Sequence, residues 1–414
     1  MADNSKIFQE RQKRYEDTIA LNKTDRIPII PMVDTFPVRY YEAKMSEVNT
    51  NHALMEDLWM RYMEEFQPDM GDNPYGINGF FGIFGALDFK LLKWAGHGLD
   101  DNASYQFVEV EMMAPDHYDW FLSDPSDYMF RHMFPRMYGK LAPLEHLPSI
   151  RPHFYHFTPY SWAAMADPAF IEVGQAMLKA GQEAAKAING LVGFSKKMNE
   201  AGFPSPIGSM TQAPLDVLGD YLRGIKGMLV DLRRQPQNVL AACEKILPSV
   251  LELGVGGCRN SGVPVCFIPL HKCMDGFMSQ DQFLKFYWPT LLELIRGLIA
   301  ENITPYLLVE GVCDQRLPIM IRDVPAGKCV FHLENSNIFK AKELARDKVC
   351  LRGNIPASIL CTGSPDDTRE YCKKLIEIVG AGGGFIMDTA VNLTDAKPEN
   401  VKVMFDYTRE HGAY

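Results

Sequence analysis

From residue 168 to the C-terminus, short apolar runs alternate with longer stretches in which apolar residues recur every three or four positions. The short runs predict β-strands; they lie at 206–210, 263–270, 304–309, 328–333, 348–352 and 384–388. The longer stretches predict helices at 168–201, 214–261, 279–301, 337–346, 365–379 and 398–411. Short strands that alternate with helices of this length are typical of βαβ units in a parallel sheet.

The N-terminal residues extend this alternation. Residues 5–24 predict a polar amphipathic helix, 26–33 an apolar strand ending at Asp34, and 52–66 a second helix. With this N-terminal pair counted, the number of units fits an α/β fold of the (β/α)8 TIM barrel type. A doubly wound sheet is the alternative, but the G-x-G-x-x-G turn that usually marks it is not found. The glycine run at 380–384 precedes a strand, which is the wrong context for that motif.

Residues 71–160 have a different character, because they are dense in aromatic residues and in glycine, proline and aspartate. No flexible linker bounds them, so we interpret them as an N-terminal, aromatic-rich insertion in a single barrel domain that spans 1–414. The aromatic side chains either build an apolar slot for a ring-shaped ligand or pack the insertion against the barrel.

Charge and cysteine usage narrow the class of protein. The formal net charge is −10 and the chain has no basic tract, which argues against a nucleic-acid partner. Residues 1–6 have no apolar signal core, and no window approaches the roughly 18 apolar residues of a membrane span, so we expect a cytoplasmic protein. Nine irregularly spaced cysteines argue against a disulfide framework, and we expect reduced thiols, most of them in the core.

Metal-type ligands follow two neighbouring predicted strands. His271 and Cys273 come after the run at 263–270, and Glu310 and Cys313 come after the run at 304–309. Side chains at the carboxyl ends of neighbouring barrel strands converge on one pocket, and this ligand set would suit zinc. The alternative is that some of them are strand-end polar residues hydrogen-bonded to loops.

Other strand ends carry candidate catalytic and substrate-binding residues. We predict catalytic roles for Asp34, Glu310 and Asp388, which follow three predicted strands. The candidate substrate-binding residues are Arg39, His97, Thr211, Gln212, Glu334 and Asn354. Asp34 is alternatively a helix or turn cap, His97 a turn residue and Asn354 a loop tie. His332 lies inside an apolar run, which is typical of a satisfied core histidine.

Three segments carry a resemblance to a known family. They are Ser279–Phe283 with Tyr287-Trp288-Pro289, Leu351–Pro356, and Lys397–Val401. In order and spacing, residues 200–412 resemble the uroporphyrinogen decarboxylase superfamily, which implies a (β/α)8 barrel. The superfamily contains decarboxylases and cobalamin-linked methyltransferases.

Two branches fit only in part. The decarboxylases hold the carboxylates of a tetrapyrrole with N-terminal arginines, but the matching stretch at 32–40 keeps only Arg39. The thiol-methylating branch binds zinc through H-x-C and a later cysteine. Here Gly311 replaces that histidine and the later turn at 387–391 has no cysteine, so His271 and Cys273 would have to replace the missing ligands.

A third branch is most similar, through Leu92–Gly98 and Gln106–Glu109: the O-demethylase methyltransferases of anaerobic corrinoid systems. This resemblance implies transfer of a methyl group from a small methoxylated aromatic substrate to the cobalt of a separate corrinoid protein, with zinc assistance. The chain has no D-x-H-x-x-G cobalt-binding pattern, so the cobalamin must arrive on its partner. A homodimer is compatible with this reading. The alternatives are a decarboxylase of a smaller substrate, with Asp34 and Arg39 in its pocket, and a non-catalytic barrel that carries a corrinoid or tetrapyrrole.

Overall fold

The structure is a computed structural model that describes residues 4–76 and 78–414. The first three residues of the N-terminal stretch in which we found no signal core, and residue 77 of the predicted insertion, lie outside the described residues. Among the described residues, no helix is long and apolar enough to cross a membrane. All nine cysteines are free, and eight of them are buried.

A parallel sheet of six strands forms the centre of the molecule. Its strands, in hydrogen-bonded order, are β4 (Ser209–Met210), β5 (Val265–Leu270), β6 (Thr304–Val309), β7 (Val330–Leu333), β8 (Cys350–Arg352) and β9 (Phe385–Ile386). Each lies within a predicted apolar run, although β4 and β9 are shorter than the runs that contain them. The longest ladder joins β5 to β6, from Val265 opposite Thr304 to Leu270 opposite Val309.

The sheet does not close into the regular eight-stranded barrel that the sequence predicts, because the described residues supply only six strands to it. The apolar run at 26–33 makes isolated bridges, one of them between Ile29 and Met387 beside β9. Pro28 and Pro31 interrupt this run, and proline cannot donate to a ladder. Beyond it, the Asp69 amide donates to the Ile29 carbonyl at 2.9 Å.

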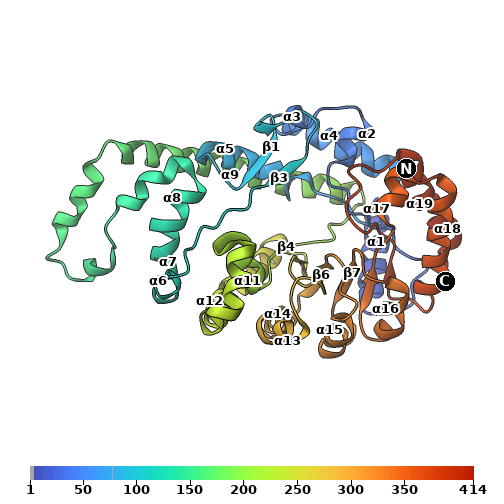
Figure 1. Ribbon diagram of the computed structural model, residues 1–414. Coiled ribbons are helices and arrows are strands. Elements are labelled where there is room, and N and C mark those ends of the chain that lie inside the picture. Colours follow the sequence, from blue (N-terminus) through green and yellow to red (C-terminus); the bar gives the residue numbers. More distant parts are fainter. Residues whose placement is uncertain (1–3, 77) are drawn as a thin grey trace.

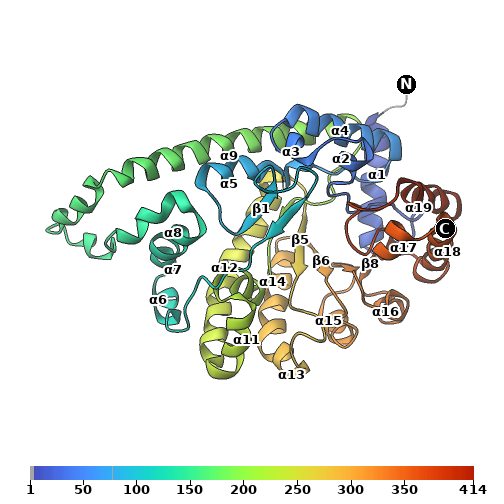
Figure 2. The same cartoon turned by 45° about the horizontal axis from the view of Figure 1, so that its top comes forward.

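Helices surround the strands (Figures 1 and 2). After β4 they are α10 (Pro214–Val217), α11 (Gly224–Arg234), α12 (Pro236–Ser261), α13 (Gln280–Gln282), α14 (Trp288–Ala300), α15 (Leu317–Asp323), α16 (Ile338–Ala345), α17 (Ala357–Thr362), α18 (Pro365–Lys374) and α19 (Pro398–His411). Helical turns of the π type continue several of them, at Leu218–Leu222, Phe283–Tyr287 and Leu375–Val379. Local signals set their starts: Pro236, Pro365 and Pro398 each lie in a first turn, where proline costs no hydrogen bond.

The N-terminal half supplies a second group of helices and a small sheet. The helices are α1 (Asn4–Ile19), α2 (Phe36–Tyr40), α3 (Met45–Val48), α4 (His52–Phe66), α5 (Phe81–Leu87), α6 (Tyr118–Ser123), α7 (Pro125–Tyr128), α8 (Phe134–Met137) and α9 (Ala169–Glu200). The strands are β1 (Leu92–Ala95), β2 (Gly98–Leu99) and β3 (Tyr105–Phe107), in the order β2-β1-β3. Short helical turns lie at Pro74–Gly76, Asn78–Phe80, Met129–Met133, Gly139–His146, Arg151–Phe154 and Pro159–Ala166. Buried insertion residues such as Tyr118 and Met133 belong to the same hydrophobic cluster as the strands.

A buried polar network attaches the segment at Met32 and the segment after β9 to the sheet. Asp388 accepts hydrogen bonds from the amide of Met32 at 2.9 Å and from Nε of Arg352 at 2.7 Å. Close by, Tyr306 donates to Nδ1 of His332 at 2.8 Å, and Nε2 of His332 donates to the Thr389 carbonyl at 2.7 Å. His332 is therefore a satisfied core histidine, as the sequence suggested, and burial lowers its pKa to about 4.

Because the pKa of buried His332 is lowered, we expect the folded protein to lose stability in acid. The pKa of His332 is about 4 in the folded chain, against 6.5 for an unperturbed histidine, so between these values the unfolded chain binds a proton that the folded chain does not. Its contribution is complete above pH 6.5 and is lost as the pH falls towards 4, at a cost on the order of 3 kcal/mol. Urea unfolding of His332→Gln from pH 8 to pH 5 should give a flatter pH dependence than wild type. The exposed variant His411→Gln should keep the wild-type slope, and an unchanged slope in His332→Gln would contradict the assignment.

Candidate functional site

His271, immediately after β5, is the centre of a polar cluster at the carboxyl edge of the sheet. Its Nδ1 lies 2.6 Å from Oδ2 of Asp220, and its Nε2 lies 3.6 Å from Oε1 of Glu310, which follows β6. The side chains of His271 and Glu310 are each 32 % exposed. The partly exposed imidazole is therefore held between two carboxylates, with Nδ1 towards Asp220 and Nε2 towards Glu310.

Two aspartates and a lysine under His271 were not predicted from the sequence. Asp216 is fully buried and accepts hydrogen bonds from the amides of His271 and Lys272, both at 3.1 Å, and from the hydroxyl of Tyr287 at 2.7 Å. The Lys272 side chain, 2 % exposed, places Nζ in contact with Asp220 and 3.8 Å from Asp216. The signal that could have revealed them is the spacing of Asp216 and Asp220, four residues apart on one helical face just after a strand.

A glycine makes room for the buried lysine. Gly219 lies between the two aspartates, and a Cβ atom there would come within 2.4 Å of Cε of Lys272. Any side chain at this position would push the ammonium group away from the carboxylates. The cluster thus depends on a small residue on the same helical turn as its acidic groups.

The charges of the cluster shift one another's pKa values. Burial opposes the charged form of His271, but the hydrogen bond to Asp220 and the charge of Glu310 outweigh it, so the net pKa of His271 is raised. Burial also raises the pKa of Asp216, with Lys272 acting in the opposite direction. The pKa of Asp220 is lowered, because the hydrogen bond from His271 and the charge of Lys272 outweigh its burial.

Two glutamates occupy the next strand ends. Burial raises the pKa of Glu310; the charge of His271 opposes this shift and that of Glu334 adds to it. Glu334, after β7, accepts a hydrogen bond from the amide of Gly311. Gln212, after β4, donates to Oδ2 of Asp220 at 3.4 Å. The structure thus brings together Gln212, His271, Glu310 and Glu334, four of the candidate residues named from the sequence.

The insertion lies beside this cluster. Although 42 % of Tyr105 in β3 stays exposed, desolvation of its hydroxyl and then the charges of Asp34 and Glu310 raise its pKa to about 12. The next aromatic residue of β3, Phe107, meets Tyr221 edge to face with ring centroids 5.9 Å apart. Asp34 accepts a hydrogen bond from Thr394 at 3.1 Å, and burial raises its pKa. Aromatic rings and carboxylates therefore share this edge of the sheet.

Five other predicted residues have contacts typical of structural or surface positions. Asp388 is fully buried in the network described above, and buried Thr211 donates to the Val250 carbonyl at 2.6 Å. Asn354 donates to the Ser336 carbonyl at 3.1 Å, as expected of a loop tie. Arg39 is half exposed and pairs with Asp395, and exposed His97 stacks on Trp94 with ring centroids 4.1 Å apart.

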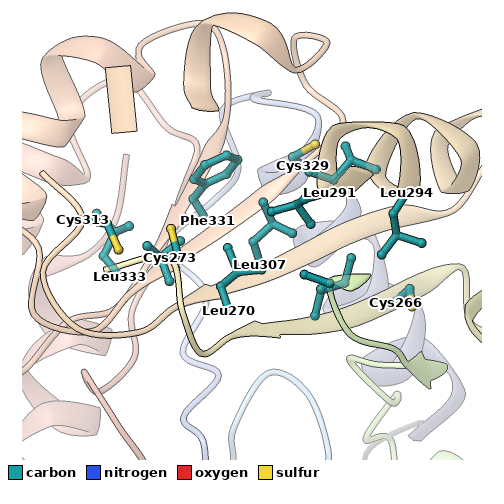
Figure 3. Close-up of a cluster of buried hydrophobic side chains, with 14 of the residues drawn as sticks. Cys266, Leu270, Cys273, Leu291, Leu294, Leu307, Cys313, Cys329, Phe331 and Leu333 are labelled. Carbon is teal, nitrogen blue, oxygen red and sulfur yellow. The ribbon is translucent and has the colours of Figure 1, made fainter. Parts of the chain in front are cut away.

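The four predicted zinc ligands separate into two pairs. Cys273 and Cys313 are both fully buried in the apolar layer shown in Figure 3, away from solvent. Sγ of Cys273 lies 3.7 Å from the Met320 sulfur, and a hydrogen bond with Cys313 raises the pKa of Cys273. Within the described part of the chain, no three His, Cys, Asp or Glu side chains are placed to hold a metal ion. These residues, as they lie, do not fit a zinc site.

The buried lysine gives a direct test of the cluster. Lys272→Met would leave Asp216 and Asp220 close together without a cation, and loss of one partner of a buried ion pair costs about 3–5 kcal/mol. We expect urea unfolding at pH 7 to show a loss of this size. Lys340→Met, on the exposed face of α16, should change the free energy of unfolding by less than about 0.5 kcal/mol. A loss below about 1 kcal/mol for Lys272→Met would contradict the ion-pair network.

Comparisons with known proteins agree with this architecture. A uroporphyrinogen decarboxylase of Chlorobium phaeobacteroides is 25 % identical over 139 residues, which cover 32 % of this chain and 38 % of that protein. One of Saccharophagus degradans is 28 % identical over 131 residues, covering 31 % of this chain and 36 % of its own. The match thus spans little more than a third of the length of these relatives.

A solved structure matches almost the whole chain. It is a methyltransferase from Methanosarcina mazei, with a TM-score of 0.63 and 15 % identity, covering 97 % of this chain and 98 % of the other. At this identity the likeness shows a shared fold. The model of the family described as uroporphyrinogen decarboxylase (URO-D) matches residues 170–411. Because the family model matches more than half of this chain's residues, the chain belongs to the uroporphyrinogen decarboxylase family.

Proposed function

We propose that this protein is a methyltransferase that moves a methyl group from a methoxylated aromatic substrate to the cobalt of a separate corrinoid protein. The observation that carries the proposal is the position of His271. It is hydrogen-bonded to Asp220 on one side, near Glu310 on the other, and partly exposed at the carboxyl edge of the sheet. Aromatic residues of the insertion lie at the same edge.

The chemistry requires a proton donor. When the bond between the methyl carbon and the ether oxygen breaks, both of its electrons stay on the oxygen, which must be protonated or otherwise stabilised. The partner's corrinoid would supply Co(I), the nucleophile that takes the methyl group. His271 would donate a proton from Nε2 to the leaving oxygen, while Asp220 holds the ring through Nδ1 and stabilises its charged form.

The surroundings of His271 suit an aromatic ether. Phe107 and Tyr221 form an edge-to-face pair at this edge, and the charges of Asp34 and Glu310 raise the pKa of Tyr105 after desolvation. We infer that the substrate ring rests against these aromatic side chains and that Glu334, Gln212 and Asp34 contact its polar groups. In-line approach of the nucleophile needs an open mouth, so we propose that the corrinoid protein docks over this edge.

The distribution of cations disfavours a polycarboxylate substrate. Lys272 and Arg352 are buried and paired with aspartates, and Arg39 pairs with Asp395 at the surface. Binding several carboxylates would require unpaired cations. Decarboxylation remains the second candidate because the curated relatives named above are uroporphyrinogen decarboxylases.

We also infer that the fold is an irregular (β/α)8 ring. The segments around Ile29 and Asp69 would take the two positions between β9 and β4. Three contacts support this: the bridge from Ile29 to Met387, the hydrogen bond from Asp69 to Ile29, and one from the Gly71 amide to the Pro204 carbonyl at 2.8 Å. We place the reaction in the cytoplasm, where the proposed corrinoid partner would be found.

Removal of the proton donor should impair transfer in a way that depends on the leaving group. With a reduced corrinoid protein and a panel of aryl methyl ethers, wild type should change the corrinoid absorbance as methyl groups are transferred. His271→Gln should lower kcat by about 10²-fold or more for ethers of weakly acidic phenols. The loss should shrink for ethers of more acidic phenols, because their leaving oxygen needs less help.

His146→Gln, an exposed histidine of the insertion, is the matched control and should keep wild-type rates. A loss in His271→Gln that is equal for all ethers would contradict the proton-donor role. A silent panel, together with release of carbon dioxide from a porphyrinogen, would replace the proposed function with decarboxylation.

Zinc at His271, Cys273, Glu310 and Cys313 stays a prediction from the sequence, and no step above depends on it. It would require both thiols to leave their apolar contacts. The prediction requires elemental analysis of protein expressed with zinc to find about one zinc per chain, lost in Cys313→Ala and kept in Cys372→Ala, a buried cysteine on α18. Zinc-free wild-type protein would withdraw the prediction.

A further inference from the structure

Helix α9 and the turns before it form an arm that projects from the rest of the molecule (Figures 1 and 2). One face of the helix is packed: Val173, Ala176 and Ala180 are buried, and Val173 joins Leu141 and Leu144 in a small apolar cluster. On the opposite face of the helix, no contact with the described residues explains why so many side chains are apolar. That composition sets the arm apart from an ordinary solvated helix.

The exposed face follows a heptad repeat. Its positions are Ile171, Gly174, Leu178, Gly181, Ala185, Ile188 and Val192, all exposed and spaced alternately by three and four residues. The large members are 60–65 % exposed, and a Cβ atom at Gly174 or Gly181 would meet nothing within 4 Å. Such a repeat over three heptads is the seam that one helix presents to another.

The residues beside the seam carry no charge. One flank has Gln175, Gln182 and Asn189, and the other has Met177, Ala184 and Leu191. The charged residues Glu172, Lys179 and Lys186 lie further around the helix. A helix face that meets only water normally carries charges, so the seam and its flanks have the composition of a covered surface.

The tip of the arm extends the apolar surface. Phe154 and Tyr160 are 93 % and 92 % exposed, and Tyr155, Phe157 and Trp162 are more than half exposed. Together with the large seam residues they expose on the order of 1,000 Å² of side-chain surface, taking about 150–200 Å² for each full side chain. That area exceeds the patch of a typical monomer and matches the roughly 800 Å² that each partner contributes to a stable interface.

We propose that the arm pairs with the arm of a second copy of this chain, antiparallel, about a two-fold axis at Gly181. A two-fold interface requires a self-complementary surface, and the seam has this property. About Gly181, Ile188 falls opposite Gly174 of the partner copy, Leu178 within one residue of Ala185, and Ile171 within one residue of Val192. Large residues thus face small or medium ones, and Gly181 meets its own counterpart, which allows the two backbones to approach closely.

The full-length protein tests the assembly by sedimentation equilibrium or light scattering. Wild type should have twice the mass of one chain at micromolar concentration. The double variant Leu178→Glu, Ile188→Glu should sediment as a monomer, with a dimer dissociation constant raised at least 100-fold. Leu253→Glu, a leucine 60 % exposed on α12, is the matched control and should stay dimeric. Circular dichroism should show that all variants keep their helices.

Cysteine crosslinking tests the orientation. Gly181→Cys should form a disulfide-linked dimer on oxidation, whereas Gly174→Cys should not unless Ile188→Cys is added. Crosslinking of both single variants would indicate a parallel pair and overturn the proposed axis. A monomeric wild type, or a dimer that survives the double glutamate change, would overturn the pairing. So would a monomer whose arm binds only an added corrinoid protein.

Discussion

The hydrogen bonds of the buried Asp388 carboxylate attach the N-terminal segment to the central sheet, and the position of Asp34 depends on them. The carboxylate joins the amide of Met32 to the guanidinium of Arg352, which itself donates to the Ile30 carbonyl at 2.8 Å. The N-terminal run contains two prolines and makes no regular ladder. These side-chain hydrogen bonds, together with two backbone bonds to Met387, hold it beside β9. With this network broken, Asp34 would lose its position at the carboxyl edge.

A second buried charge cluster determines what that edge can do chemically. Burying Asp216, Asp220 and Lys272 costs solvation free energy, and their mutual attraction repays it only while all three are present. In return the imidazole of His271 is fixed in one orientation, with its other nitrogen facing Glu310. The site therefore combines a rigid cluster of buried charges below the sheet edge with a partly open surface above it. Aromatic residues of the insertion lie at that surface.

The long helix α9 shows how one segment can serve two surfaces. One heptad stripe packs against its own chain, and the opposite stripe, centred on Gly181, stays exposed. A helix that is apolar on two faces needs two partners, because a single partner can cover only one stripe. The fold provides the first partner, and a second copy of the chain is the one that fits the self-complementary order of large and small residues.

The sequence by itself determined the helices and strands that are specified by patterns over a few neighbouring residues. The predicted helices at 52–66 and 398–411 match α4 and α19 in both bounds, and all six sheet strands lie in predicted runs, because periodicity and capping residues act over short distances. His271 and Glu310 were found in the same way, as the residues just after apolar runs. Only the tertiary structure decided that Cys273 and Cys313 turn into the apolar layer, that Asp388 is buried against Arg352, and that Asp216, Asp220 and Lys272 meet under His271. The direction of a side chain after a strand ends is set by what packs against it, and those contacts come from parts of the chain far away in sequence.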